Sequence, residues 1–306
     1  MAYDDEKVSV LELVNELLLT AVYFPKEANN CYLKSKQISR LALCLMDSFA
    51  RYEPVNPLMV GFTEIEFLRK SGIETQVKLV EVIRQSPPPL VILSEGVPLN
   101  DKCVDLFKDL SIPIVKTNEE TLCFLCEYFE YMNFRLAKSQ TIHGVLMDVY
   151  GMGVLITGKS GIGKSECAVE LIRRGHKFVA DDAVQIRFVK KGEIVGMPPK
   201  NISNFLEIRG VGVINVKSMF GVYRIVPLKK IDMEIRLQEW DSFSNKDRLF
   251  LSPNDTEIFG VKIPRVNVPV NVGRSIPVII ETAVMNMISR SFGYDATASL
   301  LSCLKN

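Results

Sequence analysis

The feature that most constrains this 306-residue chain is a glycine-rich octapeptide at residues 158–165, GKSGIGKS. It matches the pattern G-x-x-x-x-G-K-[ST], whose backbone amides surround phosphates, whose lysine reaches the outer phosphates and whose hydroxyl can bind Mg²⁺. Residues 154–156 before it read as a strand, and residues 166–174 after it read as a helix that Gly175 ends. This order predicts a nucleotide or other polyphosphate site formed by Gly158, Lys159, Ser160, Gly161, Ile162, Gly163, Lys164 and Ser165.

The rest of the chain predicts an α/β protein with two domains. In the first 135 residues, helical patterns such as 63–70 and 101–110 alternate with short apolar runs at 90–93 and 112–115. After Gly144, short β-rich runs dominate. We therefore expect an N-terminal α/β domain over residues 1–136 and a C-terminal P-loop domain, with a mixed β-sheet and flanking helices, over residues 137–306.

Composition argues against several classes of partner and location. Lys and Arg number 37 and Asp and Glu 36, a balance unlike that of a general nucleic-acid or anionic-membrane binder. Glu12, Asn15 and Glu16 interrupt the longest apolar stretch near the start, and the first six residues are acidic rather than basic. We expect neither a signal peptide nor a transmembrane span, and a cytoplasmic location.

The seven cysteines include a C-x-x-C pair, Cys123 and Cys126. An odd count in a long chain predicts reduced thiols, and no second pair lies nearby to complete a zinc site. The pair falls in a predicted helix that runs to about residue 138. We expect both thiols to pack inside the protein, with the helix's apolar positions at Leu122, Leu125, Phe129, Met132 and Leu136.

Two further segments carry charged groups suited to phosphate chemistry. Asp181 and Asp182 end an apolar strand; one could accept a hydroxyl proton while the other binds metal or orients the first, and the alternative is an exposed acidic turn. Glu207 and Arg209 alternate in an extended segment and would share a face. They suit Mg²⁺ and phosphate, respectively, or form a surface ion pair; the sequence favours neither interpretation.

The remaining candidates are weaker when taken alone. His143 and His176 are the only histidines, and each is more typical of a solvated or hydrogen-bonded turn than of a catalyst. Residues 264–274 contain two prolines, a glycine and two arginines. They predict a structured loop rather than a strand, which either closes over a phosphate site or is a solvated connection.

Taken together and in order, these motifs resemble those of the HPr kinase/phosphorylase family. The resemblance covers roughly residues 137–300 and rests on 142–150, 158–166, 179–182, 206–216, Asp247-Arg248 and 269–274. Lys159 departs from it, because the family commonly has an acidic residue there. The N-terminal domain is similar to that of the family in size and α/β character, but its sequence adds little specificity to the resemblance.

The resemblance implies a bifunctional enzyme of bacterial carbon regulation and sugar uptake. Such enzymes use ATP to phosphorylate a regulatory serine of the phosphocarrier protein HPr, and reverse this with phosphate, releasing pyrophosphate. It implies hexamers formed through the kinase domains, and for several members a response to fructose 1,6-bisphosphate. Carried over by motif, the catalytic residues are His143, Lys164, Asp182 and Arg248, the Mg²⁺ ligands are Ser165 and Glu207, and the dephosphorylation loop is Pro269, Val270, Asn271, Val272, Gly273 and Arg274.

We therefore expect a Mg²⁺-dependent protein-serine kinase that is also a phosphorylase, with HPr as its partner and neither nucleic acid nor membrane involved. Two other interpretations stay open: a nucleotide-sensing module that transfers nothing, and a P-loop kinase of small molecules. The sequence leaves open the role of the first domain, the effectors, the balance of the two activities, the effect of Lys159 and the role of His143.

Overall fold

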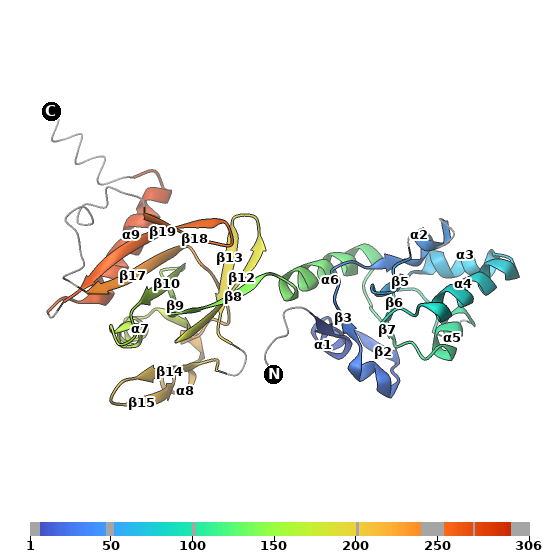
Figure 1. The fold of residues 1–306 in the computed structure, drawn as a ribbon, viewed down its shortest axis with the longest axis horizontal. Helices are drawn as coiled ribbons and strands as arrows, with labels where there is room; N and C mark the ends of the chain where they lie inside the picture. The colour runs from blue at the N-terminus through green and yellow to red at the C-terminus, as the bar shows by residue number, and fades with distance from the viewer. Residues whose placement is uncertain are drawn as a thin grey trace. The chain divides into compact units, whose positions relative to one another are not determined.

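The computed structural model describes residues 7–46, 52–99, 102–199, 202–239, 254–271 and 273–294. The chain divides into two compact units, one over residues 4–137 and one over residues 138–306. Each unit has its own sheets (Figure 1). Each also has its own buried clusters of apolar side chains. The predicted α/β class and the mixed sheet of the C-terminal unit are both confirmed.

The N-terminal unit is a sheet covered by helices on both faces. Strands β4 to β7 are parallel, and β2 joins the edge antiparallel to β7. The order is β2 (Thr20–Tyr23), β7 (Ile114–Lys116), β6 (Val91–Leu93), β5 (Leu58–Val60) and β4 (Ser39–Arg40). The other elements are β1 (Val8–Ser9), α1 (Val10–Glu16), β3 (Tyr32–Leu33), α2 (Leu41–Met46), α3 (Phe62–Lys70), α4 (Ile73–Gln85), α5 (Lys102–Asp109) and α6 (Thr121–Arg135).

Helix α6 buries only part of the face that the sequence predicts: Met132 is buried and Leu136 packs against the same cluster, whereas Leu122 and Phe129 are exposed. Phe124, Tyr128 and Met132, spaced four residues apart, lie in the core, while Leu122 is 71% exposed. Cys123 and Cys126 are both exposed free thiols, so the prediction that they pack inside was wrong. A helix with apolar residues on most of its circumference has no unique apolar stripe, and here the side with the larger aromatic side chains is buried.

The C-terminal unit contains two sheets that pack face to face. The larger has the order β11 (Lys177–Ala180), β9 (Val145–Val149), β10 (Met152–Gly158), β17 (Met233–Glu239), β19 (Val261–Val270) and β18 (Asn254–Ile258). The smaller has the order β16 (Lys229–Lys230), β13 (Glu193–Met197), β12 (Ala183–Lys190) and β8 (Ser139–His143). Leu146, Leu155 and Val179 from the first sheet meet Val184 and Ile186 from the second in one buried cluster.

The opposite face of the larger sheet is covered by helices α7 (Lys164–Arg173) and α9 (Ile276–Ser291) (Figure 1). Leu171 and Ile172 of α7 and Ile280 and Val284 of α9 lie in the same core cluster. A hairpin of β14 (Phe205–Ile208) and β15 (Gly212–Asn215), followed by α8 (Val216–Phe220), stands beside α7. Strands β10, β17 and β19 are parallel, so their carboxyl ends share one edge of the sheet. This is where open α/β sheets bind ligands.

Residues 264–270 belong to strand β19, which corrects the prediction of a loop over 264–274. Within the ladders that the structure describes, each proline of β19 is paired on one side only. Pro264 lies opposite Asp255 of β18, before the pairing with β17 begins, and Pro269 lies opposite Gln238 of β17, beyond the pairs that the described part of β18 makes. Proline has no N–H to donate to a neighbouring strand, so it is best tolerated where a strand is paired on one side only. These two positions therefore accept proline although β19 lies between two other strands of the sheet.

Candidate active site

The glycine-rich segment forms the predicted loop between β10 and α7. Gly161 and Gly163 have φ angles of +78° and +101°, which side chains with a Cβ rarely adopt. The loop thereby turns sharply and starts α7 at Lys164, two residues earlier than predicted. The helix N-terminus, with its unpaired backbone N–H groups, faces the loop and favours bound anions.

Lys164 is buried, and its ammonium lies against the loop itself. Its Nζ donates to the carbonyl oxygens of Gly158, at 3.1 Å, and of Lys159, at 3.0 Å. Burial lowers the pKa of Lys164, while the nearby charges of Asp181 and Asp182 oppose that shift. An ammonium that is removed from water and held by carbonyl oxygens is preorganised to bind a stronger acceptor, such as a phosphate oxygen.

The two adjacent aspartates have opposite environments. Asp181 is 8% exposed, and its carboxylate accepts hydrogen bonds from the Ser165 hydroxyl, at 3.0 and 3.1 Å, and from the Glu207 backbone N–H, at 3.2 Å. Burial is the largest influence on its pKa, which is raised although these hydrogen bonds favour the ionised form. Asp181 therefore joins β11, the start of α7 and β14 through one carboxylate.

Asp182 lies in the turn that leads from β11 into β12 and the second sheet. Its φ of +64° turns the chain, and its side chain is 73% exposed. Its Oδ1 lies 2.9 Å from Nδ1 of His143, and that nitrogen is also 3.0 Å from the backbone oxygen of Asp182. His143 ends β8, which pairs with β12 at Ala183, so strand pairing fixes this contact.

The β14–β15 hairpin brings Glu207 and Arg209 to the same cavity. The guanidinium of Arg209 lies over the loop: its Nη1 and Nη2 are 2.9 and 3.0 Å from where a Cβ on Gly161 would be. The φ of Gly161 favours glycine at this position, and the absence of a side chain there leaves room for the guanidinium in the arrangement observed. Glu207 and Arg209 face the site, which favours the phosphate-site interpretation over a surface ion pair.

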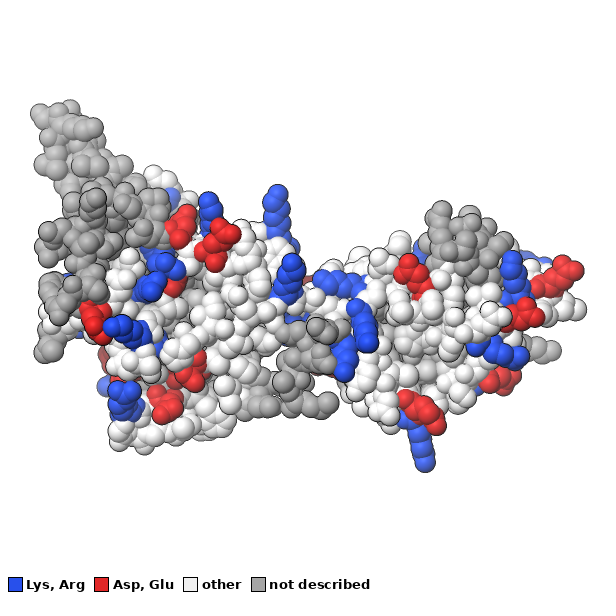
Figure 2. All heavy atoms as spheres, viewed as in Figure 1, with Lys and Arg blue, Asp and Glu red and all other residues white. Residues whose placement is uncertain are grey.

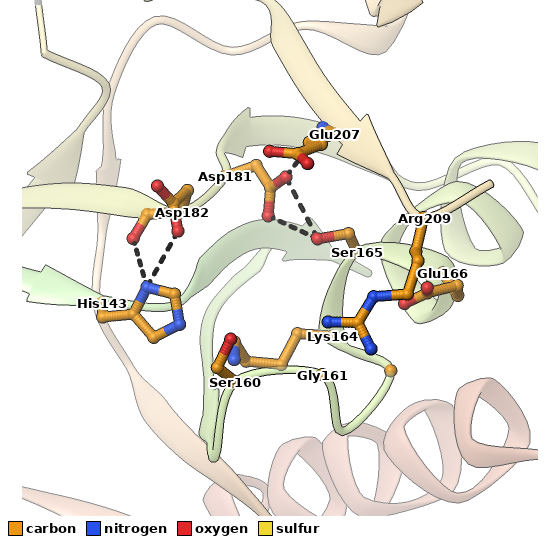
Figure 3. A pocket seen from close by; sticks show the side chains of 11 residues that line it. His143, Ser160, Gly161, Lys164, Ser165, Glu166, Asp181, Asp182, Glu207 and Arg209 are labelled. Atoms are coloured by element: carbon orange, nitrogen blue, oxygen red, sulfur yellow. Dashed lines mark hydrogen bonds and ion pairs between the residues drawn. The ribbon is translucent and has the colours of Figure 1, made fainter. Parts of the chain in front are cut away.

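These groups surround one cavity of about 130 Å³ (Figure 3). The side chains of Lys164, Ser165, Asp181 and Arg209 converge on it from α7, β11 and the hairpin, and His143 and Asp182 stand at its other side. Ser160, Gly161, Gly163, Glu166 and Glu207 complete the lining. Within the described ranges, no group of three or more His, Cys, Asp and Glu side chains could hold a metal alone. A Mg²⁺ ion here would need phosphate oxygens as further ligands, as is usual for Mg²⁺.

Not every predicted residue is at the cavity. Arg248 and Val272 lie outside the described residues, so their positions stay predictions. The described residues of the 269–274 segment do not line this cavity, nor a second cavity at the carboxyl ends of β10 and β17. They include the last two residues of β19 and lie at the same edge of the sheet. His176 is the hydrogen-bonded rather than the solvated of the two alternatives that the sequence offered: it is 5% exposed and contacts the carboxylate of Glu281 at 2.9 Å. Arg209 and Asp181 were noted in the sequence but assigned no definite role.

Comparison with known proteins identifies the family. The model of the HPr Serine kinase C-terminal domain matches residues 134–303, and that of the HPr Serine kinase N terminus matches residues 8–132. The chain belongs to the HPr kinase/phosphorylase family. Similarity to these proteins extends over almost the whole chain, including the N-terminal unit, for which the sequence motifs gave little.

Two relatives illustrate the match. An HPr kinase/phosphorylase of Enterococcus faecalis is 36% identical over 95% of this chain and 94% of its own length. One of Lactobacillus acidophilus is 36% identical over 99% of this chain and 94% of its own. The solved HPr(Ser) kinase/phosphatase of Coxiella burnetii is 32% identical and aligns with 53% of this chain and 98% of its own, at a TM-score of 0.47.

The buried carboxylate of Asp181 generates the first prediction. Because burial raises its pKa, ionising this group costs stability in the ligand-free protein. We expect Asp181→Asn to raise the melting temperature by about 1–4 °C at pH 7. The melting temperatures of wild type and variant should converge as the pH falls below the ordinary aspartate pKa of about 4, because Asp181 is then protonated in both the folded and the unfolded state. The same variant should bind nucleotide more weakly in the presence of Mg²⁺.

Thermal unfolding between pH 4 and pH 8 measures this, with Asp182→Asn as the matched control. Asp182 is exposed, so its variant should leave the melting temperature unchanged. An Asp181→Asn protein that is less stable than wild type throughout this range would show that the hydrogen bonds from Ser165 and Glu207 outweigh the cost of burial.

Proposed function

We propose that this chain transfers the γ-phosphoryl group of ATP to a serine of the phosphocarrier protein HPr and reverses the transfer by phosphorolysis. The observation that carries the proposal is an exposed carboxylate, Asp182, at the rim of the cavity that holds the buried phosphate-loop lysine, Lys164. A module that only senses nucleotide needs no proton acceptor there. Its relatives in Enterococcus faecalis and Lactobacillus acidophilus, both HPr kinase/phosphorylases, support the same reaction. Control of carbon metabolism and sugar uptake would follow from it.

The phosphate groups are held by fixed positive groups in this proposal. Backbone amides of residues 160–165 and the start of α7 surround the inner phosphates, and Lys164 exchanges its carbonyl partners for outer phosphate oxygens. Arg209 lies over Gly161 and can neutralise the charge that spreads over the phosphoryl oxygens during transfer.

Mg²⁺ fits the donor set, which consists of hard oxygen atoms. Ser165 and Glu207 would hold the ion, and Asp181, which already accepts from the Ser165 hydroxyl, would orient that hydroxyl. Two protein ligands completed by substrate phosphates and water are typical of Mg²⁺ sites. When bound, the ion supplies neutralisation of phosphate charge.

Asp182 moves the proton. In the kinase direction its carboxylate accepts the proton of the serine hydroxyl as the serine oxygen bonds to phosphorus. In phosphorolysis an oxygen of inorganic phosphate attacks the phosphorus, the bond to the serine oxygen breaks, pyrophosphate forms, and protonated Asp182 returns the proton to serine. His143, held at 2.9 Å from Oδ1, fixes the orientation of the carboxylate.

The proposal extends to assembly and location. We propose a homohexamer, on the family resemblance, and a cytoplasmic location. Among the described residues, no helix is long and apolar enough to cross a membrane. Acidic and basic side chains both occur on the face drawn in Figure 2, and the near balance of 37 Lys and Arg against 36 Asp and Glu fits a protein partner better than a nucleic acid.

The test is incubation of the protein with γ-labelled ATP, Mg²⁺ and purified HPr. The proposal expects acid-stable phosphoserine on HPr, and release of pyrophosphate when phospho-HPr is then given inorganic phosphate. Label on a small molecule instead would favour a metabolite kinase. Nucleotide binding without any transfer would favour a sensing module.

The division of roles between the aspartates generates a second prediction. We expect Asp182→Asn to bind ATP with near-normal affinity and to lose about 10²–10⁴-fold in transfer rate in both directions, because an amide cannot accept the serine proton. Nucleotide affinity by calorimetry and single-turnover transfer together measure this. Collapse of binding with normal turnover per bound ATP would make Asp182 a binding residue instead.

The segment at 269–274 generates a third prediction. It follows β19, two strands from β10 and thus about 10 Å from the start of the phosphate loop. In phosphorolysis two separate anions meet without a nucleoside to anchor either, so another guanidinium matters more than in the kinase direction. We expect Arg274→Ala to slow phosphorolysis at least about tenfold more than phosphorylation. Equal losses in the two assays would count against a direction-specific role.

A further inference from the structure

A second cavity, larger than the first, lies on the other side of the phosphate loop. Its volume is about 430 Å³, within the range of pockets that bind small molecules or short chain segments. It lies at the carboxyl ends of the parallel strands β10 and β17, and its polar lining includes His143, Thr157, Lys159, Arg236, Gln238 and Glu239. We call it the strand-end cavity. His143 lines both cavities, so the two adjoin.

In the proposed function, the strand-end cavity would lie on the acceptor side of the loop. Ser165 and Glu166, at the start of α7, line only the first cavity, and so does the cation Arg209. The nucleotide's inner phosphates bind at that helix start. The strand-end cavity instead contains the beginning of the loop, Gly158 and Lys159, and not the helix start.

Arg236 is the unneutralised cation of the strand-end cavity. It lies beside Thr157 in the parallel register of β10 and β17, on the same face as Glu234 two residues earlier. The carboxylate of Glu234 is already used, since it accepts from Thr157, at 2.5 Å, and from Nε of Arg265, at 2.7 Å. Arg236 is exposed and has no hydrogen-bond or ion-pair partner among the residues that the structure describes.

The other charges of the cavity balance one another. Nζ of Lys159 lies 3.2 Å from Oε1 of Glu239, in a pair whose side chains are 76% and 62% exposed. Such exposed pairs are weak and exchange readily, but while formed they leave no net charge. The cavity therefore carries one uncompensated positive charge, on a side chain whose planar fork suits two oxygen atoms of an anion.

We propose that Arg236 forms an oxyanion subsite for the acceptor protein, and that the strand-end cavity receives the segment that carries the serine. The proposal rests on the proposed function and adds to it a residue that selects the acceptor. The oxyanion has two possible sources with the same chemistry: an acidic side chain of the acceptor near its serine, or the phosphoryl group of phosphoserine in the reverse reaction.

The test compares Arg236→Gln with wild type in both directions. The proposal expects the KM for the acceptor to rise about three- to tenfold, with the KM for ATP unchanged. A rise for HPr and for phospho-HPr assigns the subsite to an acidic side chain, whereas a rise for phospho-HPr alone assigns it to the phosphoryl group. Arg236→Lys should bring the acceptor KM part of the way back to the wild-type value, because lysine restores the positive charge but not the planar guanidinium. A purely structural role of Arg236 would not predict this partial recovery.

Arg173→Gln is the matched control, since it removes another exposed arginine of the same unit, at the far end of α7. It should leave every KM unchanged. The proposal is overturned if Arg236→Gln has the acceptor KM of wild type in both directions, or if only its KM for ATP rises. Failure of the proposed function looks different, because wild type itself would then transfer nothing to HPr.

Discussion

The hydrogen bonds to the buried carboxylate of Asp181 hold the candidate site together. This one group binds the Ser165 hydroxyl at the start of α7 and the Glu207 N–H on β14, and it is itself at the end of β11. Three segments far apart in sequence are thereby fixed around the phosphate loop. The same burial raises the pKa of Asp181, so the ligand-free protein maintains this arrangement at a cost in stability. Active sites commonly store such costs, which bound ligand and metal relieve.

Asp182 is free for chemistry because Asp181 already does the positioning. The backbone turn at Asp182, with its φ of +64°, directs one carboxylate into the protein and the next toward solvent and His143. The two carboxylates therefore point in different directions although they line the same cavity, and their mutual repulsion is a minor influence on the pKa of Asp181. A division of labour between a buried orienting acid and an exposed proton carrier follows from the geometry of one turn.

What could be predicted from sequence is what depends on local pattern. The phosphate loop is set by glycines and by the strand and helix next to it, so residues 158–165 alone predict it. The buried face of α6 could not be predicted, since apolar residues surround that helix and only tertiary packing selects Phe124 and Tyr128. Strand β19 was missed because Pro264 and Pro269 are acceptable only at positions whose pairing the sequence does not reveal. The different environments of Asp181 and Asp182, and the approach of Arg209 to Gly161, likewise depend on distant segments.

The central claim is that one phosphate loop serves both directions of transfer. Replacing Lys164 by alanine tests it most directly, with phosphorylation of HPr and phosphate-dependent release of pyrophosphate from phospho-HPr measured on the same preparation. The account predicts that both activities are lost while the melting temperature shows that the protein is folded, and that Lys177→Ala, an exposed lysine on β11, keeps both. Near-normal turnover of Lys164→Ala in either direction would contradict it.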